Sequence, residues 1–220
     1  MNQTNIEWAD WTWNPITGCS NTCPYCYARR NAKRFHGGDF RPRFHPDRLS
    51  KPFEKRWKGK EGIVFTCSMG EFWDDKIDPI VREQVIHIVN ECPEKVFVFL
   101  TKRPENIDLT MPRNAIVGVS VDGSAGSLER IGLLDGWPGI AHRLLCFEPL
   151  LHPVRPASLK LSRIDWMIIG GQTQPNRRPE QHWVRRLVEE ARVFHVPVFV
   201  KPNAGYGTLI REFPEIELEV

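Results

Sequence analysis

Three closely spaced cysteines are the residues of this chain best suited to chemistry. Cys19, Cys23 and Cys26 lie in the run TGCSNTCPYCYARR, with three residues between the first pair and two between the second. Thiolates prefer soft metals, and iron–sulfur clusters are normally held by cysteine thiolates. A cubane cluster with only three protein ligands keeps one iron open to an exogenous molecule. The spacing therefore predicts a site-differentiated iron–sulfur cluster that supports redox or radical chemistry.

Other uses of these cysteines stay open at the level of sequence. A distant Cys67, Cys92 or Cys146 could supply a fourth ligand and close the cluster, which would favour simple electron transfer. A zinc site needs a fourth Cys or His close by, and His36 and His45 are candidates although neither has the usual ligand spacing. Cys67 and Cys92 also suit a core as small apolar side chains. A disulfide framework is not expected, because six cysteines in 220 residues are too sparse.

Length and composition predict a single α/β domain over residues 1–220. With 220 residues and 41% hydrophobic content, the chain can bury a substantial core. The longest apolar runs are far too short to cross a bilayer, and no targeting signal is apparent. We therefore expect a cytoplasmic protein with no membrane partner.

Positive charge is concentrated directly after the cysteines. The formal net charge is only +3, but the segment 27–60 holds twelve Lys or Arg against three acidic residues. Pro and Gly residues within it mark an irregular insertion at about 34–60. Basic residues with stacking platforms suit a single strand or a flipped nucleotide, although the same aromatics could simply cover the core. The aromatic residues of the basic segment 29–60 are Phe35, Phe40, Phe44, Phe53 and Trp57.

The remainder of the chain alternates short apolar runs with helix-sized segments. Helices are predicted within 78–92 and 127–137 and from about 180 to 194. Strands that are apolar on both faces and separated by such connections predict a parallel sheet with right-handed crossovers. Six or seven strands are fewer than the eight of a complete TIM barrel, so we expect a partial (β/α) barrel. The predicted strands are 12–18, 62–68, 95–101, 115–121, 142–150, 164–171 and 196–201.

Residues just past the predicted strands are further site candidates, because parallel strands bring their carboxyl ends to one edge. Cys146 and Glu148 share strand parity and are the catalytic candidates. With Lys201 they predict either an ion pair that ties strands together or groups that orient a substrate and donate a hydrogen atom. The glycine pair at 170 and 171 lacks the helix of a Rossmann fingerprint, which argues against a nicotinamide enzyme.

The cysteine run resembles the radical S-adenosylmethionine superfamily, whose signature is C-x₃-C-x₂-C with an aromatic residue, here Tyr25, before the third cysteine. Over about residues 4–204 the chain resembles an uncharacterised, phage-associated radical S-adenosylmethionine-like family described as a domain of unknown function. Relatives commonly carry a longer insertion within the cysteine run, whereas this chain has the compact spacing. The architecture is also distantly similar to spore photoproduct lyase. The matching segments are IEWADWTWNPITGC, SMGE, VFVFLTKRPE, VGVSV, RLLCFEPL, IDWMIIGG and VPVFVKPN.

This resemblance implies a 4Fe-4S cluster on the three cysteines, with S-adenosylmethionine chelated at the open iron. In the superfamily a glycine-rich turn ending in Glu contacts the amino group of the cofactor, although only one glycine is present here. Ser120 is placed to bond the ribose or the methionine carboxylate, and the glycine pair would let adenine approach the backbone. The cofactor-binding residues expected on this basis are Gly70, Glu71, Ser120, Gly170, Gly171 and Lys201.

The expected function is a radical S-adenosylmethionine enzyme. It would use an external one-electron reductant to cleave S-adenosylmethionine and generate a 5′-deoxyadenosyl radical. The basic, aromatic segment suggests a nucleic-acid base as the target of repair or modification. The alternative is a non-catalytic iron–sulfur or zinc protein that binds nucleic acid or a protein partner.

Overall fold

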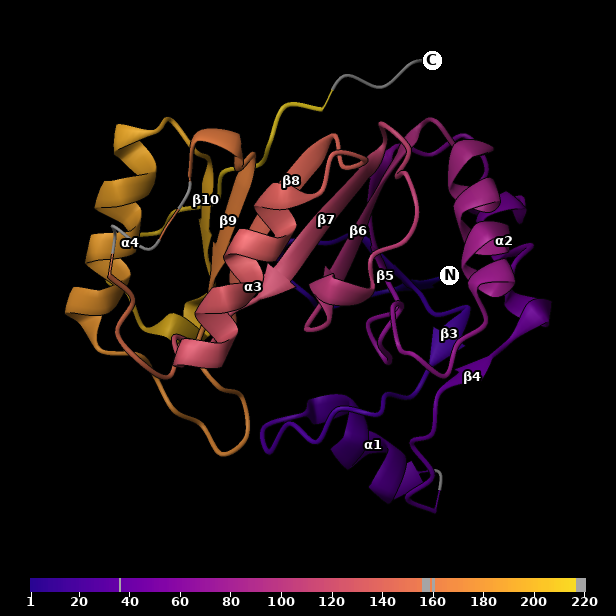
Figure 1. Cartoon of the computed structure of the whole chain (residues 1–220), viewed down its shortest axis with the longest axis horizontal. Helices are drawn as coiled ribbons and strands as arrows, with labels where there is room; N and C mark the ends of the chain where they lie inside the picture. The colour runs from indigo at the N-terminus through magenta and orange to yellow at the C-terminus, as the bar shows by residue number, and fades with distance from the viewer. Residues whose placement is uncertain (36, 156–158, 160, 217–220) are drawn as a thin grey trace.

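The protein is organised around one eight-stranded, mainly parallel sheet (Figure 1). This computed structural model describes residues 1–35, 37–155, 159 and 161–216; His36 and the side chain of Phe35 lie outside that part. β1 pairs antiparallel with β2, and the other seven strands pair in parallel, so the predicted α/β class is confirmed. In sheet order the strands are β1 (Asn2–Gln3), β2 (Trp11–Trp13), β5 (Gly62–Thr66), β6 (Lys95–Thr101), β7 (Ala115–Ser120), β8 (His142–Phe147), β9 (Trp166–Ile169) and β10 (Val198–Val200).

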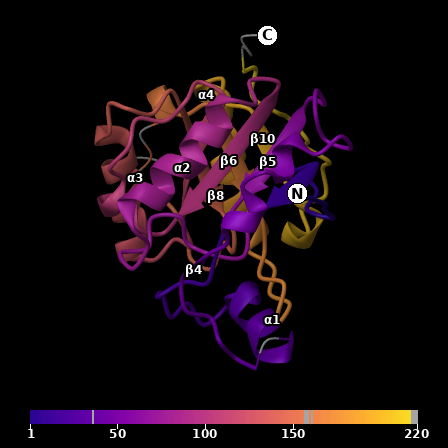
Figure 2. The ribbon, with the colours of Figure 1, turned by 90° about the vertical axis from the view of Figure 1, so that its right-hand side faces the viewer.

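Three α-helices connect parallel strands and pack on one face of the sheet (Figures 1 and 2). The Asp78 carboxylate accepts the Ile80 N–H at 2.9 Å and caps the first of them. The links from β6 to β7 and from β8 to β9 contain the short 3-10 turns η3 (Pro104–Asn106) and η5 (Leu161–Arg163). Among the described helices, none combines the length and the apolar character needed to span a membrane. The connecting helices are α2 (Pro79–Asn90), α3 (Ala125–Gly136) and α4 (Gln181–Val193).

Alternate residues of the strands face two separate apolar cores. Phe97 and Phe99 of β6 point into the larger core, where the helices pack, whereas Val98 between them belongs to a second core on the other face. Cys146 of β8 also lies in this second core, which Trp8 helps to fill. Side chains alternate along a strand, and both faces are covered, which explains why the strands are almost continuously apolar.

The segment between β2 and β5 carries the cysteines and lies beyond one end of the sheet, where helix α1 (Tyr27–Phe35) is seen in Figures 1 and 2. The single strand predicted at 12–18 was wrong: β2 ends before Pro15, and the next residues form a separate strand in a two-stranded sheet. Proline lacks the N–H that a continuous ladder needs. The rest of the segment between β2 and β5 also contains regular elements, and three of them, β4, η1 and η2, lie inside the irregular insertion predicted at about 34–60. The elements of the segment are β3 (Ile16–Thr17), α1 (Tyr27–Phe35), β4 (Arg43–Phe44), η1 (Pro46–Arg48) and η2 (Lys51–Phe53).

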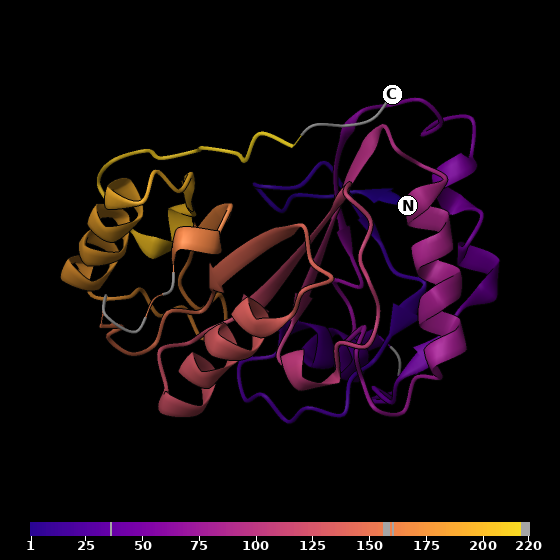
Figure 3. The same ribbon diagram turned by 45° about the horizontal axis from the view of Figure 1, so that its top comes forward.

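The chain after β10 returns along the edge of that strand. Val200 N–H donates to Ile210 O, and Glu212 N–H donates to Val198 O, each at 3.0 Å. The ring of Phe213 then packs 5.7 Å from Trp166, measured between ring centroids. In Figure 3 this segment, drawn in yellow, leaves the region of α4 and crosses the top of the view.

Candidate functional site

Two glycines bring the cysteine loop against the turn that follows β5. Gly18 and Gly70 form a parallel bridge, in which Gly18 N–H donates to Met69 O at 2.9 Å and Glu71 N–H donates to Gly18 O at 3.1 Å. Gly18 has φ of +81°, and a Cβ there would lie 2.0 Å from the Arg41 carbonyl oxygen. Only glycine permits both this conformation and this approach, so the position just before Cys19 is restricted to it.

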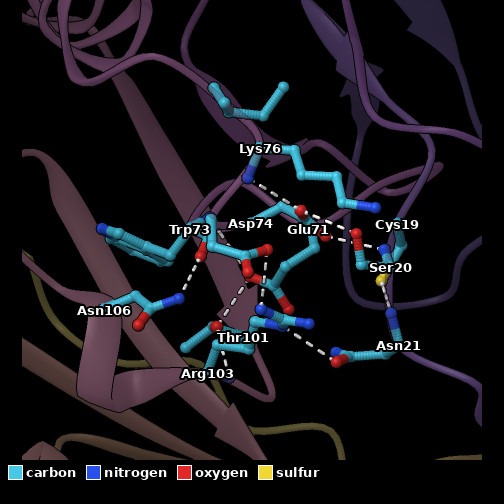
Figure 4. Close-up of polar contacts among 12 residues, drawn as sticks. Cys19, Ser20, Asn21, Glu71, Trp73, Asp74, Lys76, Thr101, Arg103 and Asn106 are labelled. Atoms are coloured by element: carbon cyan, nitrogen blue, oxygen red, sulfur yellow. Dashed lines mark hydrogen bonds and ion pairs between the residues drawn. The ribbon is translucent and has the colours of Figure 1, made fainter.

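Two further side chains, those of Asp74 and Arg103, hold the loop through hydrogen bonds (Figure 4). The fully buried Asp74 accepts the Ser20 N–H at 2.7 Å and the Ser20 hydroxyl at 3.0 Å. Arg103 Nε donates to Asn21 Oδ1 at 2.9 Å. Burial acts to raise the pKa of Asp74, but the hydrogen bonds from Ser20 and Lys76 outweigh it and lower that pKa. Sequence reasoning missed Asp74, because a carboxylate in the turn after a strand carries no local signal of this partner.

The three cysteines of the motif line a single cavity of about 370 Å³. Cys67 and Cys146 line the same cavity, whereas Cys92 is buried in the core beneath the helices. Gly170 is not among the cavity-lining residues, and a Cβ added there would lie 3.2 Å from the Glu148 side chain. The other predicted site residues are brought together around the cavity: Gly70, Glu71, Ser120, Cys146, Glu148, Gly171 and Lys201.

Two of the motif thiols accept hydrogen bonds from backbone N–H groups. The Cys19 sulfur accepts the Asn21 N–H and the Cys26 sulfur accepts the Arg29 N–H, each at 3.3 Å, and such bonds tune clusters by stabilising thiolate charge. Without a metal, burial raises the pKa of the Cys19 thiol to about 12. No three His, Cys, Asp or Glu side chains of the described residues converge on a single ion. A cubane cluster takes one thiolate on each iron, so cysteines spread around one cavity are the donor set that fits it.

A small apolar cluster covers the cysteines on the side away from the sheet. Ala28 and Ala32 of α1 pack with Phe40, and Cys19 and Cys26 lie against them. The guanidinium of Arg29 stacks 4.9 Å from the Phe40 ring centroid and also donates to the Cys19 carbonyl oxygen at 3.0 Å. A helix that begins directly after the third cysteine therefore closes the site, and the sequence analysis did not predict this helix.

Glu71 is buried at the cavity wall with most of its acceptor capacity used. Its Oε1 accepts the Thr101 hydroxyl at 2.6 Å and the Trp73 N–H at 3.3 Å, and its Oε2 accepts the Lys102 N–H at 3.0 Å (Figure 4). Burial nevertheless raises the pKa of this carboxyl. A carboxylate can accept about four hydrogen bonds, and the bonds from Thr101, Trp73 and Lys102 use most of these sites. About one acceptor site, on Oε2, is therefore left for a ligand in the cavity.

Two tyrosines tie the cysteine segment to the carboxyl ends of strands. The Tyr25 hydroxyl donates to Asp122, after β7, at 2.9 Å, and the Tyr27 hydroxyl donates to the Ser68 carbonyl oxygen, after β5. Burial raises the pKa of Tyr25, and the hydrogen bond to Asp122 raises it further. The Lys102 ammonium lies 5.9 Å from the centroid of the same ring. The aromatic residue before the third cysteine is thus held at both its ring and its hydroxyl.

A partly buried ion pair lies at another part of the cavity wall, close to a thiol. The Lys201 ammonium contacts Glu148 at 2.5 Å and Glu7 at 3.4 Å. Burial acts to lower the pKa of Lys201, but the charge of Glu148, the hydrogen bond to it and the charge of Glu7 together outweigh burial and raise that pKa. Cys146 is 2% exposed, and burial raises the pKa of its thiol, which therefore keeps its proton at neutral pH.

The aromatic residues of the basic segment pack mainly against the protein. Phe40 and Trp57 are buried, and the Trp57 ring lies 5.6 Å from Trp11. Phe44 is partly buried against the larger core, while Phe53 is exposed. Stacking platforms for bases are therefore scarce among the described aromatics of this segment.

The protein is an α/β protein in which five cysteines line a cavity at the carboxyl ends of the parallel strands. Residues 3–212 match the model of the family described as "Protein of unknown function (DUF5131)". Because this match spans most of the chain, the protein belongs to that family. No curated protein and no solved structure matches the chain.

Proposed function

We propose that this protein is a radical S-adenosylmethionine enzyme whose 4Fe-4S cluster is held by Cys19, Cys23 and Cys26. The observation that carries the proposal is that these three thiols line one cavity together with the polar residues at the strand ends. The sheet would be the partial barrel of that superfamily. Such a cluster requires a reducing compartment, for which we propose the cytoplasm.

The chemistry that the cluster supplies when bound is one-electron reduction of S-adenosylmethionine, which breaks a carbon–sulfur bond to give methionine and a 5′-deoxyadenosyl radical. Glu71 would bind the ammonium of the methionine moiety through its remaining acceptor site. Tyr25 would keep the third cysteine in position through Asp122. The protein's own residues thus bind and orient the cofactor and keep water away.

Cys146 and the Glu148–Lys201 pair would act on the substrate. The ion pair presents fixed charge to a polar substrate group. The Cys146 thiol is buried, protonated and at the cavity wall, so it can return a hydrogen atom to a substrate radical. That transfer breaks the S–H bond and leaves a thiyl radical, which one electron from the external reductant and one proton convert back to the thiol.

Anaerobic reconstitution followed by electron paramagnetic resonance tests the proposal. The reduced protein should give a cubane signal that shifts when S-adenosylmethionine is added. Cys23→Ala should lose the signal and most of its iron, whereas Cys92→Ala, a core cysteine away from the cavity, should keep both. Full iron in Cys23→Ala, or zinc in place of iron, would contradict the proposal.

A second candidate function, an electron-transfer protein, follows from the cysteines that share the cavity. Cys67 and Cys146 line it together with the motif, so either could be a fourth ligand that leaves no open iron. In that case Cys67→Ala or Cys146→Ala would lower the iron content, and the wild-type signal would not respond to S-adenosylmethionine. Retention of iron in both variants favours the radical enzyme.

A further inference from the structure

A second, larger cleft lies between the basic segment and residues of β2 and β3, and it is distinct from the cysteine-lined cavity. Its volume is about 780 Å³, and the residues that line it include Thr12, Asn14 and Thr17, contributed by β2, β3 and the turn between them. Two acidic side chains, Asp39 and Asp47, line it. The basic side chains that line it are Arg41, Arg43, His45, Arg48, Lys51 and Arg56.

The ion pairs made by the basic side chains that line the cleft leave an excess of positive charge. Arg41 and Arg43 share the single carboxylate of Asp39, at 2.9 and 3.0 Å. Lys51 and Arg56 likewise share Glu54. Each group of three therefore carries one net positive charge, in a concave site whose field attracts anions.

Only a thin wall separates this cleft from the cysteine-lined cavity. Gly18 lines the cleft, while its neighbour Cys19 lines the cavity. In the same way, Met69 lines the cleft and its neighbour Ser68 lines the cavity. Phe40 borders both spaces. A long anion bound in the cleft would therefore pass directly beside the cysteine loop.

We propose that this cleft binds the phosphates of a single-stranded nucleic acid, with a neighbouring nucleotide reaching the cavity past Phe40. The Arg41–Arg43 pair and the Lys51–Arg56 pair supply charged donors for phosphate, and the threonine and asparagine side chains that line the cleft supply neutral ones. Because most aromatics of the segment pack inward, binding rests on phosphate contacts more than on base stacking. The role of the cavity rests on the proposed function, whereas phosphate binding by the cleft does not.

Fluorescence anisotropy with a labelled 12-nucleotide single strand tests the cleft in the full chain. Arg41→Gln combined with Arg43→Gln removes two exposed charges from the cleft. The matched control, Arg185→Gln with Arg186→Gln, removes two exposed charges from α4. We expect the cleft variant to bind about 10- to 100-fold more weakly at low salt, with a salt slope reduced by about 1.4, and the control to bind like wild type.

Each other outcome overturns the proposal. Equal weakening in both double variants would indicate non-specific attraction. Adenosine monophosphate bound as tightly as the strand would make the cleft a mononucleotide site. Polyglutamate binding that depends on these arginines, without strand binding, would make it a docking site for an acidic protein. The Cys23→Ala variant should lack the cluster and still bind the strand like wild type. The test of the cluster and the test of strand binding by the cleft can therefore fail independently.

Discussion

At the scale of single residues, the carboxylate of Asp122 links the cysteine segment to β7. It accepts the Tyr25 hydroxyl at 2.9 Å and is also bonded by the N–H and hydroxyl of Ser124, at 2.9 and 2.6 Å. A carboxylate with this many donors is stabilised in its charged form. Its ionisation should therefore be visible in the acid stability of the protein.

Asp122→Asn should reduce the loss of stability at low pH. Burial acts to raise the pKa of Asp122, but the hydrogen bonds outweigh it and lower the pKa from 3.8 to about 2. Because the folded pKa is the lower one, the stabilisation is present above pH 3.8 and is lost as the pH falls through about 2. Urea unfolding at several pH values measures this. If both proteins lose the same free energy of unfolding over this window, Asp122 has no such role.

The substitutions Trp8→Phe and Trp166→Phe each replace a buried indole with a smaller ring, so their effects on stability can be compared directly. Both are at most 2% exposed, but the Trp166 indole N–H donates to the Glu212 carbonyl oxygen at 2.9 Å, while the Trp8 indole N–H has no partner among the described residues. Trp166→Phe should cost about 1 kcal/mol more free energy of unfolding than Trp8→Phe, because only it breaks a hydrogen bond. Equal costs by denaturant titration would contradict this assignment.

At the scale of elements, α1 and the loop carrying Phe40 form a unit that packs on the cysteines and separately from the two large cores. Its apolar residues make their own cluster, which includes Cys19, Cys26 and Met69. Units with few contacts to the main core open independently of it. The cover of the proposed cluster should therefore be less stable than the sheet.

Phe40→Ala should loosen the cysteine segment without unfolding the sheet. The substitution empties the centre of the small cluster and removes the stack on Arg29. Hydrogen exchange should increase over about residues 17–45, while β6 and β7 remain protected. The matched variant Phe97→Ala, in the larger core, should instead increase exchange throughout. A uniform increase in Phe40→Ala would refute independent opening.

At the scale of the whole molecule, the segment after β10 protects an exposed sheet edge. Residues 210–212 bond to Val198 and Val200, and Glu212 also pairs with Arg192 of α4 at 2.6 Å. Phe213 covers Trp166 and Phe199 on the second core. An unprotected edge strand is a template for pairing with another chain.

Removal of residues 210–220 should therefore destabilise the protein by about 3 kcal/mol and cause self-association, because buried apolar surface and a sheet edge both become exposed. Chemical unfolding and light scattering measure the two effects. A chain ending at Ile216 keeps all the contacts named here and is the control. A shortened chain that stays monomeric and equally stable would show that the segment has no such role.

The sequence by itself determined the elements whose pattern is local. β6 was predicted at its observed bounds, and α4 within one residue at each end, because continuous apolar runs and helical periodicity depend on neighbouring residues. The three motif cysteines and most of the predicted strand-end residues lie around one cavity, although Gly170 does not line it, because parallel strands collect their carboxyl ends at one edge.

Only the tertiary structure decided which distant residues complete the site. Asp74 is 54 residues from Ser20, and Asp122 is 97 residues from Tyr25, so no pattern of nearby residues reveals either pair. The role of the aromatics was decided in the same way, since a Phe or Trp in a basic segment can stack on a ligand or pack inward. Burial depends on what the rest of the chain places opposite the ring, and that is a property of the folded molecule alone.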